Sequence, residues 1–349
     1  MTKTAVVLFN LGGPDGPQAV APFLFNLFKD PAILRLPQPF RYLLARWIAK
    51  RRTRRARAIY AKLGGGSPIL PLTEKQAAAL AVALESDEAD HEYRVFVAMR
   101  YWHPFSAETA AKVKAWSPDR IVLLPLYPQF STTTTGSSLK AWKKASRKAG
   151  IDAPAHAICC YPLAAGFQKA VAALLHQARV GNNARARVLF SAHGLPKKII
   201  AGGDPYEWQI NETVKGIVAE LGDPALDWVV CYQSRVGPLE WIGPSLDDEI
   251  DRAARDGVPV LVVPVAFVSE HSETLVELDI TYRALAEKRG VPAYARVPTV
   301  GTEGPFIQAL AGLVQNACAR ATPLGSEGGE RICPRNFSGC LNLNTRTGK

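Results

Sequence analysis

One histidine and a pair of glutamates have the side chains and spacing needed to move protons or hold a metal ion. His193 directly follows an apolar run and precedes Gly194, which we expect to leave open space beside the imidazole. Glu273 and Glu277 are four residues apart with no base between them, so on a helix they share a face. Carboxylates held together need a cation, a shared proton or solvent, and imidazole and carboxylate both bind divalent metals. These residues therefore predict proton transfer or metal binding, against the alternatives of a structural histidine and a solvated acidic face.

A second region combines apolar and basic side chains. Between Arg41 and Lys62 the chain has nine basic residues and no acidic one, while apolar residues including Trp47 and Ile48 recur at helical spacing. The pattern predicts either a helix packed on the core with a solvated basic face, or an amphipathic helix that contacts a hydrophobic ligand or a membrane surface. Farther along, the hydroxyl-rich loop 131–138 suits either helix capping or anion binding at a helix N-terminus.

Composition limits the class of protein. The chain has 349 residues, 48% of them apolar and 21% charged, which indicates a folded protein of about two domains. Its six cysteines lack the spacing of a disulfide scaffold, and the N-terminus lacks the pattern of a signal peptide, so we expect a cytoplasmic location. The net charge of +11 suits an anionic partner, but no nucleic-acid-binding module is present and we expect no nucleic-acid partner.

Short, almost continuously apolar runs alternate with helical patterns along the chain. This alternation predicts an α/β fold of two similar doubly wound (Rossmann-like) domains, each with a four-stranded parallel sheet, and an active-site cleft between them. The expected strands are Thr4–Phe9, Tyr93–Met99, Arg120–Leu126, His156–Cys160, Arg187–Ala192, Asp227–Tyr232, Val260–Val268 and Ala293–Val297. We expect domains at 1–165 and 166–320, followed by a cysteine-containing tail at 321–349. Ligands of such sheets bind at the carboxyl ends of the strands, where His193 lies.

Several motifs, in order along the chain, resemble the ferrochelatase family, from about residue 5 to residue 315. They are Asn10–Pro14, Lys50–Thr53, Gly64–Pro68, Tyr127–Ser131, Thr135–Ser138, Ser191–Pro196, Gln233–Pro238 and His271–Leu275. The resemblance implies a fold of two similar α/β domains with the porphyrin in the cleft. It also implies a lyase that inserts ferrous iron into protoporphyrin IX, giving protohaem and two protons, the terminal step of haem biosynthesis.

The resemblance also implies roles for individual residues. His193 and Glu273 match the catalytic and iron-binding positions, and Glu277 and Asp279 match an acidic path that leads away from them. The porphyrin-contacting positions are Arg52, Tyr60, Ser67, Arg100, Tyr101 and His103, the first three within a lip at about 35–70. This lip resembles one that opens toward a membrane surface, so we expect peripheral contact with the inner face of the cell membrane. The alternatives are a coproporphyrin ferrochelatase and a non-catalytic two-lobed protein that binds haem or metal.

The cysteines leave one cofactor question open. Some ferrochelatases carry a [2Fe–2S] cluster, which needs four ligands. Candidate ligands are Cys159, Cys160, Cys333 and Cys340, but the internal position used in animal enzymes is Thr132 here. The alternatives to a cluster are a disulfide and free thiols. The oligomeric state stays open.

Overall fold

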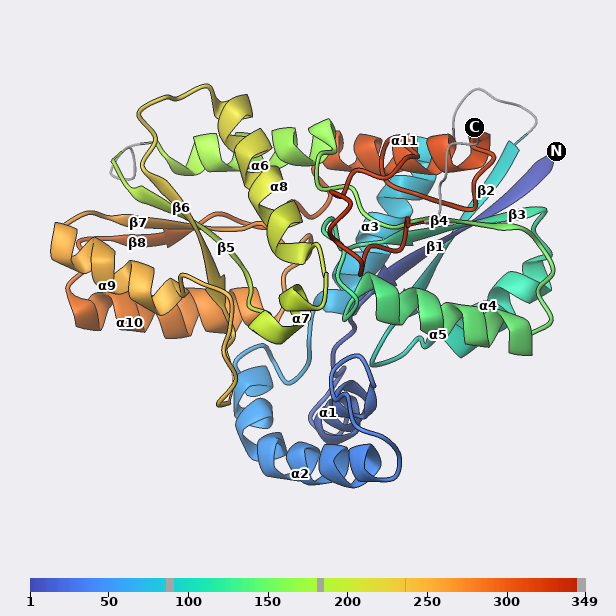
Figure 1. Ribbon diagram of the computed structural model, residues 1–349, viewed down its shortest axis with the longest axis horizontal. Helices are drawn as coiled ribbons and strands as arrows, with labels where there is room; N and C mark the ends of the chain where they lie inside the picture. The colour runs from blue at the N-terminus through green and yellow to red at the C-terminus, as the bar shows by residue number, and fades with distance from the viewer. Residues whose placement is uncertain (86–90, 181–184, 236, 344–349) are drawn as a thin grey trace. The chain divides into compact units, whose positions relative to one another are not determined.

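The computed structural model describes residues 1–85, 91–180, 185–235 and 237–343 (Figure 1). Val236, within one of the motifs, and the last residues of the predicted tail lie outside this part. The chain divides into two compact units, the first made of Met1–Cys160, Leu310–Ile332 and the segment from Leu341, the second of Tyr161–Ala309 and Cys333–Cys340. Within the described residues, no helix is both long and apolar enough to cross a membrane.

The first unit is built on a parallel sheet of five strands in the order β2-β1-β3-β4-β9. The strands are β1 (Thr2–Asn10), β2 (His91–Met99), β3 (Arg120–Pro125), β4 (Ala155–Ile158) and β9 (Leu324–Gly325). Residues Ala5–Phe9 of β1 are at most 1% exposed, as expected for a strand that is covered on both faces. Alternate residues of β1 pack on α4 (Ser106–Trp116) and α5 (Thr135–Lys148). Figure 1 shows these two helices on one face of the sheet.

Two helices near the N-terminus form a separate layer of the first unit. They are α1 (Val20–Lys29) and α2 (Phe40–Ala61), and α3 (Ile69–Leu84) follows them. Residues of α1, Ala49 and Tyr60 of α2, and Tyr101 just beyond β2 form one apolar cluster. This cluster attaches the helical pair to the carboxyl edge of the sheet.

The second unit contains a parallel sheet of four strands in the order β6-β5-β7-β8. Its strands are β5 (Arg187–His193), β6 (Trp228–Gln233), β7 (Val260–Pro264) and β8 (Tyr294–Arg296). The helices of this unit are α6 (Ala165–Ala178), α7 (Lys197–Ala201), α8 (Tyr206–Leu221), α9 (Leu246–Asp256), a π-helix (Glu273–Tyr282) and α10 (Arg283–Arg289). Side chains from α9, α10 and the π-helix pack on this sheet as one core.

The structure confirms the two parallel-sheet α/β domains, and every strand predicted from the sequence is present. The expectation of four strands in the first domain is wrong, because the tail adds β9 beside β4. Backbone hydrogen bonds from Ala157 N to Pro323 O (2.7 Å) and from Cys159 N to Gly325 O (2.8 Å) attach it. The cleft between the domains stays a prediction.

The limits of the compact units differ from the predicted limits at residues 165 and 320. The chain passes from the first unit to the second between Cys160 and Tyr161, and α11 (Gly304–Ala319) begins in the second unit and ends in the first. The tail then divides, since Cys333–Cys340 packs with the second unit. The chain goes back to the first unit within the continuous helix α11. Composition does not change there, so it gave no sign of this boundary.

Candidate active site

His193 and Glu273 meet at the carboxyl edge of the second sheet. His193 is the last residue of β5, and Glu273 begins the π-helix that follows the neighbouring strand β7. His193 Nδ1 lies 3.0 Å from Glu273 Oε2, and the two side chains are 37% and 26% exposed within the described chain. The pair predicted from the sequence is therefore brought into hydrogen-bonding contact, and each side chain is only partly exposed.

At Gly194 the ends of β5 and β6 approach each other closely. This differs from the open space that the sequence predicted beside the imidazole. A Cβ atom at residue 194 would lie 3.0 Å from the carbonyl oxygen of Gln233 and 3.3 Å from the ring of Trp241. Gly194 N also donates to Gln233 O at 2.8 Å. Glycine at this position therefore allows the two strand ends to lie close together.

Residues at the end of β6 hold the acidic side of the cluster. Gln233 Nε2 donates to the backbone carbonyl of Glu273 at 3.0 Å, and Ser234 Oγ donates to Glu277 Oε2 at 2.6 Å. The segment that carries both glutamates is a π-helix, a rare conformation that frequently marks functional sites. Three strand ends thus converge on one group of ionisable side chains.

His271 belongs to the same cluster, although we did not predict it as a site residue. Its Nε2 atom lies 3.7 Å from Glu273 Oε2, and its Nδ1 atom lies 3.1 Å from the carbonyl oxygen of Ser269. The ring is buried and makes an edge contact with Phe267 at 4.7 Å. In the sequence, its position two residues before Glu273 could have indicated that it belongs to the site. Glu273 therefore has an imidazole on each side.

The pKa values of these groups move in opposite directions. Burial by itself would lower the pKa of His193, but the Glu273 carboxylate beside it raises that pKa above 6.5. Burial would raise the pKa of Glu273, yet His193 and His271 hold it below its usual value. For Glu277, burial and the charge of Glu273 both raise the pKa. The site thus contains one firmly ionised carboxylate and one that takes up a proton more readily, the arrangement that separates acid and base roles.

We expect the titration of His193 to reveal this coupling directly. Its imidazole should titrate with a midpoint above 6.5 in the native protein and at a lower pH in Glu273→Gln, because the amide carries no charge to stabilise the imidazolium. Neutral imidazole, the form that accepts a proton, therefore predominates only above the raised pKa. NMR of the ring protons measures both midpoints, and Glu287→Gln on α10 is the control. Equal midpoints in the native protein and Glu273→Gln would contradict the coupling.

Asp279 has a different environment from Glu277. Arg296 donates from Nε and Nη2 to the two carboxylate oxygens of Asp279, at 2.7 and 2.8 Å, and from Nη1 to Glu270 at 2.9 Å. The charge of Asp279 is thus balanced by a guanidinium. The predicted acidic path stays a prediction, and the contacts favour Glu277 as its member nearest the histidine.

The porphyrin-contacting residues expected from the resemblance all lie in the first unit. The guanidinium of Arg52 lies 5.4 Å from the ring of Phe28, and Tyr60 is buried. The Ser67 backbone N–H donates to Pro14 O at 2.7 Å.

The other three of these residues lie just beyond β2. His103 Nδ1 is 2.8 Å from Glu108 Oε1 at the surface. Arg100 and Tyr101 both donate to Asp30, a residue that the sequence analysis did not identify.

All four cysteines considered as cluster ligands are buried. The sulfur atoms of Cys159 and Cys160 are 3.5 Å apart, and Gln209 Nε2 lies 3.1 Å from the sulfur of Cys333. Cys340 is also buried, and no disulfide is formed among the described cysteines. Over the described ranges, no three His, Cys, Asp or Glu side chains are grouped so that they could hold a metal ion.

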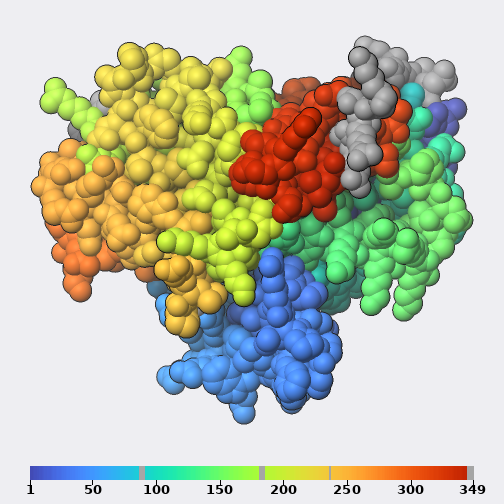
Figure 2. Space-filling view, viewed as in Figure 1, coloured from blue at the N-terminus to red at the C-terminus, as the bar shows by residue number. Residues whose placement is uncertain are grey.

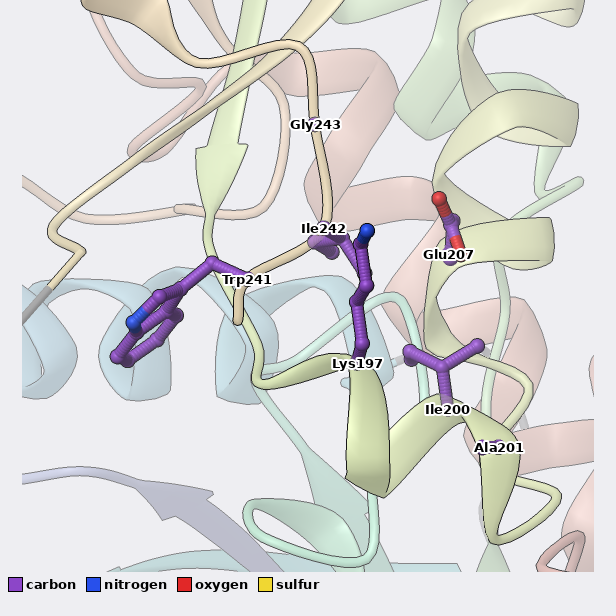
Figure 3. A pocket seen from close by; sticks show the side chains of 7 residues that line it. All are labelled: Lys197, Ile200, Ala201, Glu207, Trp241, Ile242 and Gly243. Carbon is purple, nitrogen blue, oxygen red and sulfur yellow. The ribbon is translucent and has the colours of Figure 1, made fainter. Parts of the chain in front are cut away.

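A hollow of about 610 Å³ lies elsewhere in the second unit. Figure 3 shows its lining side chains, which come from α7, α8 and the segment before α9. They are Lys197, Ile200, Ala201, Glu207, Trp241, Ile242 and Gly243. Neither His193 nor Glu273 lines it, so the hollow is separate from the ionisable cluster.

The chain thus combines two parallel-sheet α/β units with imidazole and carboxylate side chains at the carboxyl edge of one sheet. The fold is similar to that of "SirB from Bacillus subtilis with Fe3+", with a TM-score of 0.54 over 91% of this chain and 96% of that chain. At 12% sequence identity this likeness concerns the fold alone.

The chain belongs to the ferrochelatase family. The family model described as Ferrochelatase matches residues 3–318. The ferrochelatase of Caulobacter vibrioides (strain NA1000 / CB15N) is 52% identical over 340 residues, which are 97% of each chain. The ferrochelatase of Phenylobacterium zucineum is 52% identical over 349 residues, or 99% of each chain. The resemblance found in the sequence motifs is thereby confirmed.

Proposed function

We propose that this protein inserts ferrous iron into protoporphyrin IX and releases protohaem and two protons. The observation that supports this most is the contact between His193 and Glu273, with Glu277 and His271 beside it. A ferrous ion and two pyrrole N–H groups need a group that attracts the cation and groups that take protons. The cluster supplies both within one unit.

The charges suggest a division of labour among these side chains. Glu273, which stays ionised, favours the approach of the cation. Neutral His193 accepts a pyrrole proton as a general base, and the resulting imidazolium is stabilised by Glu273. Glu277 has a raised pKa and lies beside the pair, so it can receive this proton from His193 and leave the imidazole free to accept the second pyrrole proton. The two electrons of each broken N–H bond stay on the pyrrole nitrogen, which then binds iron.

The test is an anaerobic absorbance assay with ferrous iron and protoporphyrin IX. The proposal expects the porphyrin spectrum to be replaced by that of protohaem over many turnovers. A coproporphyrin ferrochelatase would instead turn over coproporphyrin III faster. A non-catalytic binding protein would shift the porphyrin spectrum without inserting iron.

We further propose that the first unit binds the porphyrin through Arg52, Tyr60, Ser67, Arg100, Tyr101 and His103. Guanidinium groups are suited to the porphyrin propionates, because they pair with carboxylates through two parallel hydrogen bonds. Stacking of Arg52 on Phe28 leaves the edge of the guanidinium for such a pair. Tyr101 is buried, so we expect it to act through the residues that it supports.

The exposed apolar surface of α2 supports a cytoplasmic enzyme in peripheral contact with the inner face of the cell membrane. Phe40, Leu43 and Trp47 are 65%, 60% and 56% exposed, and Arg51 lies over the Trp47 ring at 5.4 Å. Figure 2 shows α1 and α2, in blue, at the surface of the molecule. Apolar and basic side chains on one helix favour binding to anionic lipid. The helix also packs on the core through Ala45 and Ala49, so core packing and a membrane-facing surface are compatible.

Replacement of both Leu43 and Trp47 by serine should weaken binding to anionic vesicles by about tenfold or more. Burial of a large apolar side chain contributes about 1.5–3 kcal/mol, and the two side chains together supply much of the apolar surface of this helix. Vesicle co-sedimentation at low salt measures the loss. Val82→Ser, which removes a 69% exposed apolar side chain from α3, is the control. Unchanged binding in the double variant would remove α2 from the membrane surface.

A [2Fe–2S] cluster is the part of the resemblance that the cysteines do not support. Four ligands would have to come from the pair Cys159 and Cys160 and from the tail residues Cys333 and Cys340. Iron and acid-labile sulfide in anaerobically purified protein decide the matter. About two of each per chain would establish a cluster. Absence of sulfide, with all cysteines titratable after denaturation, would leave free thiols.

A further inference from the structure

Asp30 is a buried carboxylate on which two distant segments of the first unit converge. It directly follows the last residue of α1 as the C-cap, and its side chain is 2% exposed. Its Oδ2 atom accepts hydrogen bonds from Arg100 Nη2 at 2.6 Å and from Tyr101 OH at 2.9 Å, and also from Ser137 Oγ at the start of α5. Its Oδ1 atom accepts from the backbone of Ala32 at 2.9 Å. Every partner of this carboxylate is thus a donor.

The same contacts restrain Arg100 from several directions. Besides the bond to Asp30, its Nε donates to Ser137 Oγ at 2.6 Å, and its guanidinium lies 4.9 Å from the ring of Tyr101. The Arg100 side chain is nevertheless 21% exposed, so it is not sealed inside the unit. A long flexible side chain is here held in one orientation. Its rotamer entropy is lost on folding, so binding does not have to order it again.

A buried carboxylate is costly unless it is paired and hydrogen-bonded. An apolar residue at position 30 would serve the packing of α1 without that cost. The carboxylate is therefore best explained by what it holds, namely the guanidinium and phenol that follow β2.

We propose that Asp30 is a positioning residue of the porphyrin site, which fixes the Arg100 guanidinium so that its exposed edge meets the substrate preorganised. The inference rests on the proposed function, because it takes Arg100 as a porphyrin contact. Asp30 itself does not touch the substrate. Its effect passes through Arg100 alone.

The test is a double-mutant cycle between Asp30→Asn and Arg100→Ala, read by porphyrin KM, iron KM and porphyrin fluorescence titration. Asparagine keeps the shape of the side chain but loses the charge. It should raise the porphyrin KM and Kd about tenfold and leave the iron KM unchanged. In the Arg100→Ala background the same change should have no further effect on porphyrin binding, since two residues that act as one unit are not additive. Additive effects, or lower thermal stability with an unchanged porphyrin KM, would overturn the proposal.

Two further variants keep the test decisive. If Asp30→Asn does not fold, Ser137→Ala removes one contact to Asp30 and one to Arg100 and should raise the porphyrin KM about threefold; an unchanged KM would then refute the proposal. Asp223→Asn, which breaks an Asp–Arg pair with Arg179 in the second unit, is the control and should leave KM unchanged. Absence of iron insertion by the native protein would instead refute the proposed function, whereas fluorescence still reports on Asp30.

Discussion

Replacement of His193 by alanine should lower the rate of iron insertion by about 100-fold or more and leave the protein folded. A positioned general base contributes about 10²–10⁴-fold, and His193 is the imidazole that contacts Glu273 at 3.0 Å. Its side chain is 37% exposed at a strand end, so its removal leaves no large cavity in the core. Loss of the imidazole should therefore affect kcat far more than the melting temperature.

The measurement is kcat with protoporphyrin IX and ferrous iron, together with thermal unfolding and porphyrin binding. His176→Ala, an exposed histidine on α6 of the same unit, is the control and should retain native activity. If His193→Ala turned over at a near-native rate, His193 would not be the proton acceptor. The native pH–rate profile should rise through the His193 pKa, which lies above 6.5 because of Glu273.

Glu273→Gln is expected to cause the second large loss, also about 100-fold or more. The amide has nearly the shape of the carboxylate, but it cannot attract a cation and cannot offset the charge of a protonated His193. Both imidazoles lie within 3.7 Å of the same carboxylate oxygen, so one substitution removes the negative charge that both share. The loss should appear in kcat and in the iron KM together.

Iron-dependent kinetics separate this result from a general structural defect. The control is Glu287→Gln, an exposed residue of α10 near the π-helix in sequence. Native porphyrin binding with failed insertion is the expected behaviour of Glu273→Gln. Wild-type iron KM and kcat would remove Glu273 from the site.

Several features of the fold and site could be predicted because they depend on local pattern. Strands such as Val260–Pro264 are short, apolar and β-branched, which identifies strands buried on both faces. Once the strands are known, parallel topology brings their carboxyl ends to one edge, so His193 and Glu273 were recognisable as neighbours. The sequence motifs by themselves indicate the family.

Other features had no local signal. The two-residue strand Leu324–Gly325 is too short for any periodicity, and it exists only because β4 offers an unpaired edge. The segment 273–282 has the composition of an α-helix, yet it adopts π-helical bonding. Asp30 is an isolated aspartate in the sequence, and its partners Arg100 and Ser137 are 70 and 107 residues away.

The sequence by itself determined the class of fold, the order of the strands along the chain and the residue types available at their carboxyl ends. Hydrophobic runs and their spacing are sufficient for this, because burial acts on each segment separately. Only the tertiary structure decided which ionisable side chains touch, that His271 joins Glu273, that Asp279 is balanced by Arg296, and that Asp30 holds Arg100. The physical reason is that a hydrogen bond or ion pair depends on distances of about 3 Å between residues far apart in the chain, which no local pattern encodes.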